Sequence, residues 1–151
     1  MLKRFARFSL AISEIDRCWH KLAAEEMAKH ELNSPHAVYL CALYEYEEGI
    51  TAAELCEICR KNKADVSRMV AILEKKGLIR KEGNQYRARI LLTEEGKQAA
   101  AHVRERAALA VELAGAGLSP ESREIFYAAL EQITANLQIL SREGLPSPEL
   151  S

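Results

Sequence analysis

The chain has 151 residues, of which 48% are hydrophobic and 28% charged, and its formal net charge is −1. This length fits one domain with a helical extension, and the apolar content supports a buried core. No apolar run approaches the roughly 20 residues of a membrane-spanning helix, and charges interrupt any signal-peptide core near the N-terminus. We therefore expect a cytoplasmic protein with reduced cysteines.

The first predicted element is a long helix over residues 9–29. Leu10, Ile15, Trp19 and Leu22 lie on one apolar stripe, and charged residues occupy the other side. A helix of this length at the start of a small domain has few intramolecular partners. We expect it to pack against another chain or against the C-terminal helix.

A second, largely buried helix is predicted to begin at Ser34 and Pro35, with Ser34 as the N-cap and Pro35 at the first helical position. An acidic connection over residues 45–49 follows it. Thr51 and Glu54 then have the spacing of a capping box, which predicts the start of a third helix. The apolar stripe predicted for this third helix consists of Leu55, Ile58 and Cys59.

Asn62 is the N-cap predicted for a fourth helix, with Asp65 at the third helical position. Gly77 ends this helix, where a left-handed residue is favoured. The apolar side chains that recur at helical spacing and must face a core are Val66, Met69, Val70 and Leu73. The opposite face carries the short or cationic side chains of Lys63, Ser67, Arg68 and Lys75.

Two strands, over residues 78–81 and 86–92, are predicted next, with a hairpin turn at Gly83 and Asn84. Two short helices, a tight turn and this hairpin make a winged helix-turn-helix. Residues 60–89 carry ten cations and three anions, a net charge of +7 within a chain of −1. Cations concentrated on one element favour DNA binding through counterion release, although most charge runs are only solvated helix faces.

After the hairpin, Thr93 is predicted to cap a helix that runs to about Ala114, and Ser119 to cap a last helix with one apolar side. The expected fold is mainly α, with a small β wing. The expected divisions are an N-terminal dimerisation helix (1–34), a winged helix-turn-helix (35–93), C-terminal dimerisation helices (94–143) and a flexible tail (144–151).

Four segments in this order resemble the MarR (multiple-antibiotic-resistance regulator) family. They are Thr51-x-x-Glu-Leu, Asn62-Lys-Ala-Asp-Val-Ser-Arg-x-Val, Leu73-Glu-Lys-Lys-Gly-Leu-Ile and Leu92-Thr-Glu-Glu-Gly. The resemblance implies a homodimeric transcription factor, usually a repressor, that binds a palindromic operator in double-stranded DNA. It also implies that DNA affinity is lowered by a small ligand bound between the dimerisation helices and the winged domain, or by cysteine oxidation.

By matching positions, Lys63, Ser67 and Arg68 would enter the major groove, and Arg87 or Arg89 would be the minor-groove arginine of the wing. The wing departs from the family pattern, because residues 83–87 lack the usual aspartate two positions before the arginine. The residues predicted to contact DNA are Asn62, Lys63, Ala64, Ser67, Arg68, Lys75, Arg80, Arg87 and Arg89.

Other side chains are weaker candidates for a site. Trp19, His36, Tyr39 and Tyr44 could line an effector pocket, although aromatic residues are more often part of the core. Cys56 and Cys59, spaced as CxxC, are better explained as small core residues than as a redox pair, and Cys18 is a further redox candidate. The sequence predicts no metal site, no cofactor and no enzymatic activity. Two alternatives to a DNA-binding regulator remain, a winged-helix protein-interaction module and a cysteine-based redox sensor.

Overall fold

The computed structural model describes residues 2–148. Six helices and three short strands form this part of the chain, so the fold is mainly α as predicted. In order they are α1 (Leu2–Ala28), α2 (His36–Tyr44), β1 (Ile50–Thr51), α3 (Ala52–Cys59), α4 (Lys63–Lys75), β2 (Ile79–Glu82), β3 (Arg89–Leu92), α5 (Glu94–Ala114) and α6 (Pro120–Glu143). None of the described helices has the length and apolar character needed to cross a membrane. The last three residues of the predicted tail lie outside the described residues.

The chain divides into two units, Met1–Leu109 and Ala110–Ser151, and the boundary falls within α5. The first unit contains the sheet, α1 to α4 and most of α5. In the second unit, Arg123 Nη1 donates to Glu112 Oε2 at 2.9 Å, and Arg123 Nη2 donates to the Gly115 carbonyl at 3.0 Å. No described residue of α6 is buried, so its own unit does not cover the predicted apolar stripe.

The sheet of the first unit has three antiparallel strands in the order β1-β3-β2, with Ile50 opposite Ile90 and Ile79 opposite Leu92. The prediction of a two-stranded hairpin was therefore incomplete. The missing strand, β1, has only two residues, which is too short for an alternating pattern to show in the sequence.

The connection between β2 and β3 is also longer than predicted. Residues 83–88, which we call the wing loop, separate the strands, so the expected strand over 86–92 begins only at Arg89. Within the loop the Arg87 amide donates to the Asn84 carbonyl at 2.9 Å. Tyr86 is 98% exposed and has no packing that would favour a longer strand.

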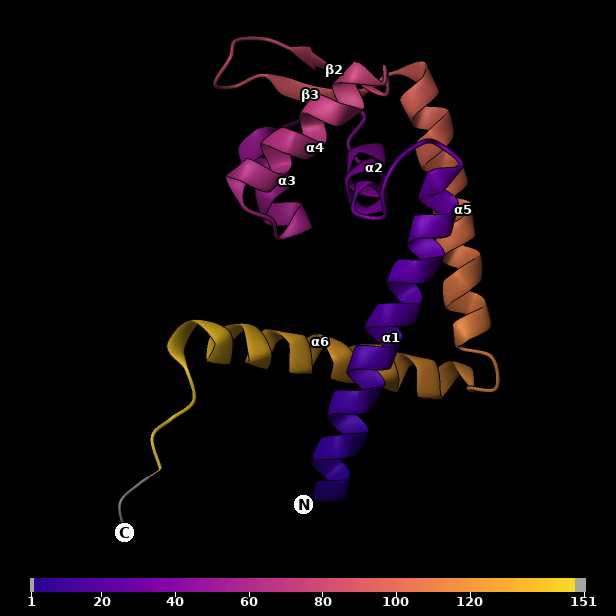
Figure 1. Cartoon of the computed structure of the whole chain (residues 1–151), viewed down its shortest axis with the longest axis vertical. Coiled ribbons are helices and arrows are strands. Elements are labelled where there is room, and N and C mark those ends of the chain that lie inside the picture. Colours follow the sequence, from indigo (N-terminus) through magenta and orange to yellow (C-terminus); the bar gives the residue numbers. More distant parts are fainter. Residues whose placement is uncertain (1, 149–151) are drawn as a thin grey trace. The chain divides into compact units, whose positions relative to one another are not determined.

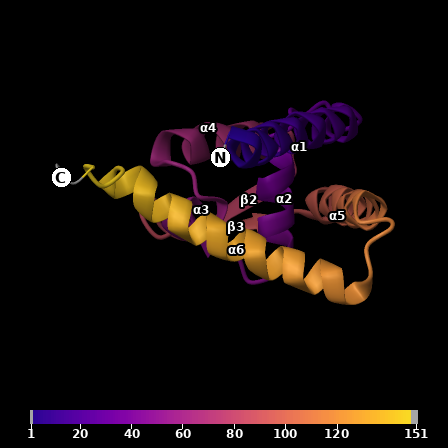
Figure 2. The same cartoon turned by 90° about the horizontal axis from the view of Figure 1, so that it is seen from below.

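The core of the first unit lies where α2, α3 and α4 meet the sheet. In Figures 1 and 2, α3 and α4 lie on one side of α2, and α5 lies on the other. The buried side chains come from every element of this unit: Met27, Tyr39, Leu40, Leu43, Ile50, Leu55, Val66, Val70, Leu73, Ile79, Ile90, Leu92, Ala100 and Val103.

The predicted helix starts are confirmed where a side chain caps the backbone. Thr51 Oγ1 accepts from the Glu54 amide at 3.2 Å and Glu54 Oε2 accepts from the Thr51 amide at 2.9 Å, which completes the capping box. Asn62 Oδ1 accepts from the Asp65 amide at 2.8 Å, and Ser119 Oγ from the Ser122 amide at 3.1 Å. Each cap satisfies amides that have no partner within their helix.

Two predicted boundaries differ from the structure. Helix α1 begins at Leu2 rather than at Ser9, since no helix breaker stands in the first residues. Helix α2 begins at His36, and Ser34 makes no side-chain cap. Instead, His36 Nδ1 accepts from the Asn33 amide at 3.0 Å, which ties the residues before the helix to its first turn but caps none of the helix's own amides.

The start of α5 is tied to the start of β2 by a contact that we call the α5–wing junction, made of Gly77, Leu78, Thr93 and Gly96. Thr93 Oγ1 donates to the Gly77 carbonyl at 2.6 Å and accepts from the Gly96 amide at 3.1 Å. The Thr93 amide donates to the Leu78 carbonyl at 3.0 Å. The predicted cap at Thr93 is confirmed, and it also fixes α5 on the hairpin.

Candidate nucleic-acid interface

Helix α4 has one buried and one exposed face, as predicted. Val66, Val70 and Leu73 are buried, because their spacing places them on one side of the helix, against the core. The exposed residues of the opposite face are Lys63, Ala64, Ser67, Arg68 and Lys75. Short and cationic side chains on an exposed helix can reach both phosphates and base edges in a DNA groove.

Two of the predicted arginines are held by carboxylates of their own element. Arg68 Nη2 donates to Asp65 Oδ1 one turn earlier on α4, and Arg80 Nη1 donates to Glu82 Oε1 on β2. Both arginines remain more than half exposed. Their ion pairs are therefore solvated and weak enough to exchange for another anion.

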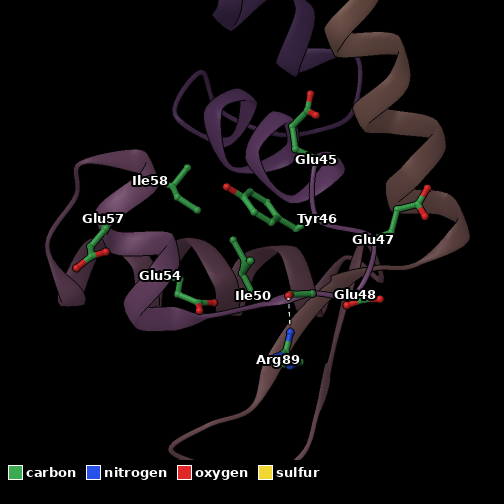
Figure 3. Close-up of a pocket in the computed structure, with 10 residues that line it drawn as sticks. Glu45, Tyr46, Glu47, Glu48, Ile50, Glu54, Glu57, Ile58 and Arg89 are labelled. Carbon is green, nitrogen blue, oxygen red and sulfur yellow. Dashed lines mark hydrogen bonds between the residues drawn. The ribbon is translucent and has the colours of Figure 1, made fainter.

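The structure separates the two candidate wing arginines. Arg87 lies in the wing loop and is exposed, whereas Arg89 lies at the start of β3. Arg89 Nη1 donates to the Gly49 carbonyl at 3.1 Å, a contact drawn in Figure 3. This bond holds Arg89 at the base of the wing, next to β1, and leaves Arg87 as the arginine of the loop.

An acidic cleft of about 660 Å³ lies beside β1 and α3. Figure 3 shows Tyr46 and Ile58 facing the same hollow, with glutamates around it. Ile58 was predicted to face the core, but it is 40% exposed, because Leu55 and Cys59 alone fill the core side of α3. The glutamates of the cleft are Glu45, Glu47, Glu48, Glu54 and Glu57. Like charge on this side repels a phosphate backbone.

A second cavity, of about 280 Å³, lies between α1, α2 and α5 within the first unit. Its charged lining residues, Glu26 and Arg106, are paired with each other, with Arg106 Nε 3.0 Å from Glu26 Oε1. The rest of its lining is almost entirely apolar: Trp19, Leu22, Ala23, Met27, Ala37, Val38, Cys41, Val103 and Ala107. We call it the α1–α2–α5 pocket.

The structure does not bring the four predicted pocket residues to one cavity. Trp19 lines the α1–α2–α5 pocket, but His36 and Tyr39 are each 1% exposed and belong to the core. Tyr44 lies under the Arg104 guanidinium, with Arg104 Cζ 4.5 Å from its ring centroid. His36 and Tyr39 are three residues apart and therefore share one face of α2, as a pocket would require, but that face packs against the core. The aliphatic residues that line the α1–α2–α5 pocket have no polar group or motif that would have identified them as a binding site from the sequence.

The cysteines lie in different environments. Cys18 is exposed on α1, and Cys56 and Cys59 pack on the core as predicted. Burial raises the pKa of the Cys59 thiol, and the neighbouring Cys56 raises it further. A raised pKa lowers the thiolate fraction on which oxidation depends. Within residues 2–148, no group of three His, Cys, Asp or Glu side chains could hold a metal ion.

His36 predicts a pH dependence of stability. Burial lowers the pKa of its imidazole, the nearby Lys76 lowers it further, and Nε2 has no hydrogen-bond partner among the described residues. The unfolded chain then binds a proton more readily than the folded chain, so the free energy of unfolding falls as the pH drops below about 6.5. Urea unfolding at a series of pH values measures the slope. In His36→Gln the part of the slope due to this imidazole is lost; an identical slope would contradict the prediction.

Residues 30–90, which span this interface and the wing, match the model of the MarR family. The winged helix of this chain belongs to the MarR family. A MarR-family regulator from Listeria monocytogenes complexed with 26mer DNA is similar over 91% of this chain and 95% of its own, with a TM-score of 0.79 and 22% identity. The Staphylococcus aureus MepR–DNA complex covers 86% and 97%, with a TM-score of 0.79 and 20% identity.

A MarR transcriptional regulator from Methanosarcina mazei Go1 is similar over 89% of this chain and 92% of its own, with a TM-score of 0.77 and 21% identity. No curated protein sequence matches the chain. The structural similarities extend beyond the matched segment and cover most of the chain, so the long helices on both sides of the MarR-family winged helix are part of the shared fold.

Proposed function

We propose that this protein is a sequence-specific, DNA-binding transcriptional regulator that acts as a homodimeric repressor. The observation that carries the proposal is the exposed basic face of α4 within a MarR-family winged helix. In the proposal, Lys63, Ser67 and Arg68 enter the major groove, and Arg87 reaches the minor groove from the wing loop. Asn62, Ala64, Lys75, Arg80 and Arg89 complete the proposed interface.

Two similar structures support the DNA partner, because those two regulators are bound to DNA. The charge distribution agrees with it. The segment 60–89 is strongly basic, whereas the cleft beside α3 is acidic. A duplex would therefore be attracted to α4 and the wing and repelled from the cleft.

Exposed apolar side chains support the proposed dimer. On α1, Phe5, Leu10 and Ile15 are 69%, 70% and 58% exposed. On α6, Ile125 is 70% exposed, although it belongs to the predicted apolar stripe. A second copy would remove these faces from water. In a two-fold dimer the two α4 helices would meet successive major grooves about 34 Å apart.

The α1–α2–α5 pocket supports control by a small, mostly apolar ligand. Its volume of about 280 Å³ suits a compact molecule, and the Glu26–Arg106 pair offers the ligand one polar edge. The raised pKa of Cys59 makes oxidation at the CxxC pair the weaker alternative. If the conformations that bind DNA well and poorly differ in how α1 and α5 pack, a ligand that binds one of them more tightly would change the DNA affinity.

Selection of duplexes from a random pool tests the proposal, followed by anisotropy titrations of the selected duplex. We expect a palindromic sequence, bound by two chains, whose affinity falls by about 10³-fold or more between roughly 50 and 200 mM salt. Light scattering gives the mass of the free protein. A protein-interaction module would instead select no sequence and show no such salt dependence, and this outcome would overturn the proposal.

A further inference from the structure

Asp65 is an acidic residue within the basic segment, and it lies in the first turn of α4, the helix proposed to enter DNA. It is the third residue of α4, and Asn62 Oδ1 accepts from its amide at 2.8 Å. An anion in the first helical turn is stabilised by the helix dipole. The same anion would be repelled by the phosphates of a bound duplex, so a carboxylate here weakens DNA binding unless it has another role.

The ion-pair partner of Asp65 is Arg68, one turn later on α4. Asp65 Oδ1 accepts from Arg68 Nη2, so the pair spans one turn of the exposed face. The Asp65 side chain is 35% exposed and the Arg68 side chain 69%. The carboxylate is thus the more sheltered partner, and the guanidinium extends beyond it. Burial raises the pKa of Tyr39, and the negative charge of Asp65 raises it further.

The other cations of this face are not restrained in this way. Among the described residues, Lys63 and Lys75 form no ion pair with a carboxylate, and neither does Arg87 in the wing loop. Flexible, unpaired cations attract any phosphate backbone, whatever its sequence. An arginine held by a carboxylate has its charge offset and its planar fork kept in one orientation, which suits bidentate contact with the O6 and N7 atoms of guanine.

We propose that Asp65 is a specificity-determining residue that holds the Arg68 guanidinium, weakening binding to arbitrary DNA while keeping Arg68 oriented for a base edge. This inference rests on the proposed function, since it concerns how the same interface selects its site. On DNA of arbitrary sequence, Arg68 could replace its ion pair with Asp65 only by an ion pair with a phosphate. A correctly placed guanine offers two directed acceptors.

The test measures the affinities of wild-type protein and Asp65→Asn for the selected palindrome and for a scrambled duplex of equal length. With one cation released per chain, we expect Asp65→Asn to bind the scrambled duplex about tenfold more tightly at low salt. The slope of log affinity against log salt should steepen by about 2 for a dimer. The ratio of specific to non-specific affinity should fall by about tenfold.

Glu74→Gln is the matched control, because it removes one negative charge from the exposed surface of α4 without releasing an arginine. A second control is Asp65→Asn in an Arg68→Ala background, where both duplexes should bind more tightly by the same factor, so that the loss of specificity vanishes. The inference is overturned if Glu74→Gln reproduces the loss of specificity, or if the loss persists without Arg68. Wild-type protein that selects no sequence would overturn the proposed function itself, and the inference with it.

Discussion

Replacing Gly96 with alanine is expected to lower the free energy of unfolding by about 2–3 kcal/mol. A Cβ atom at this position would lie 1.9 Å from the Leu78 carbonyl oxygen, 2.9 Å from its carbon and 3.2 Å from Leu92 Cδ2. Two of these atoms are backbone, so the α5–wing junction must open to admit a methyl group. Alanine normally favours a helix over glycine by about 1 kcal/mol, but here the steric conflict outweighs that preference.

Urea unfolding followed by circular dichroism measures the change, and Gly115→Ala is the matched control. A Cβ at Gly115 would lie 3.1 Å from Arg123 Nε, a contact with a side chain rather than with backbone, which needs a shift of only a few tenths of an ångström. We expect that variant to stay within about 0.5 kcal/mol of the wild type. Equal stability of the two alanine variants would show that the contact between Gly96 and Leu78 is not the constraint described here.

Replacing Arg68 with alanine is expected to weaken binding to the selected palindrome by about 1–3 kcal/mol for each α4 helix, which is roughly fivefold to 150-fold per helix. Two effects add. The directed contact with a base is lost, and the Asp65 carboxylate is left without its partner beside the phosphates. The fold should be unaffected, since the Arg68 side chain is 69% exposed.

Anisotropy titrations measure this loss, with Lys21→Ala as a control that removes one cation from the exposed surface of α1. Arg68→Lys separates charge from geometry, because lysine keeps the positive charge but lacks the planar fork. We expect Arg68→Lys to retain most non-specific binding and to lose preference for the palindrome. Unchanged affinity of Arg68→Ala for that palindrome would remove α4 from the proposed interface.

The parts of the fold that the sequence predicted depend on neighbours within one helical turn. Thr51, Asn62, Thr93 and Ser119 each cap a helix through an amide three residues ahead, so a short motif contains all the needed information. The buried and exposed faces of α4 follow from the same local period. The individual DNA contacts remain predictions, because they need the partner molecule.

The parts that sequence reasoning missed depend on contacts between distant segments. Strand β1 exists because Ile50 pairs with Ile90, forty residues later. The α1–α2–α5 pocket is lined by aliphatic side chains from three helices, and only Trp19 among the aromatic candidates reaches it. Of the three apolar residues on α3, the core buries Leu55 and Cys59 and leaves Ile58 exposed, and the sequence of α3 alone does not show this choice.

The α5–wing junction gives two distant parts of the first unit a common anchor. The Thr93 hydroxyl joins the turn after α4 to the first turn of α5, and Val103, Arg106 and Ala107 of the same rigid helix form one wall of the pocket. The same helix therefore contributes both to the junction with the hairpin and to the lining of the pocket, and Thr93 is the residue whose hydroxyl joins its first turn to the turn after α4.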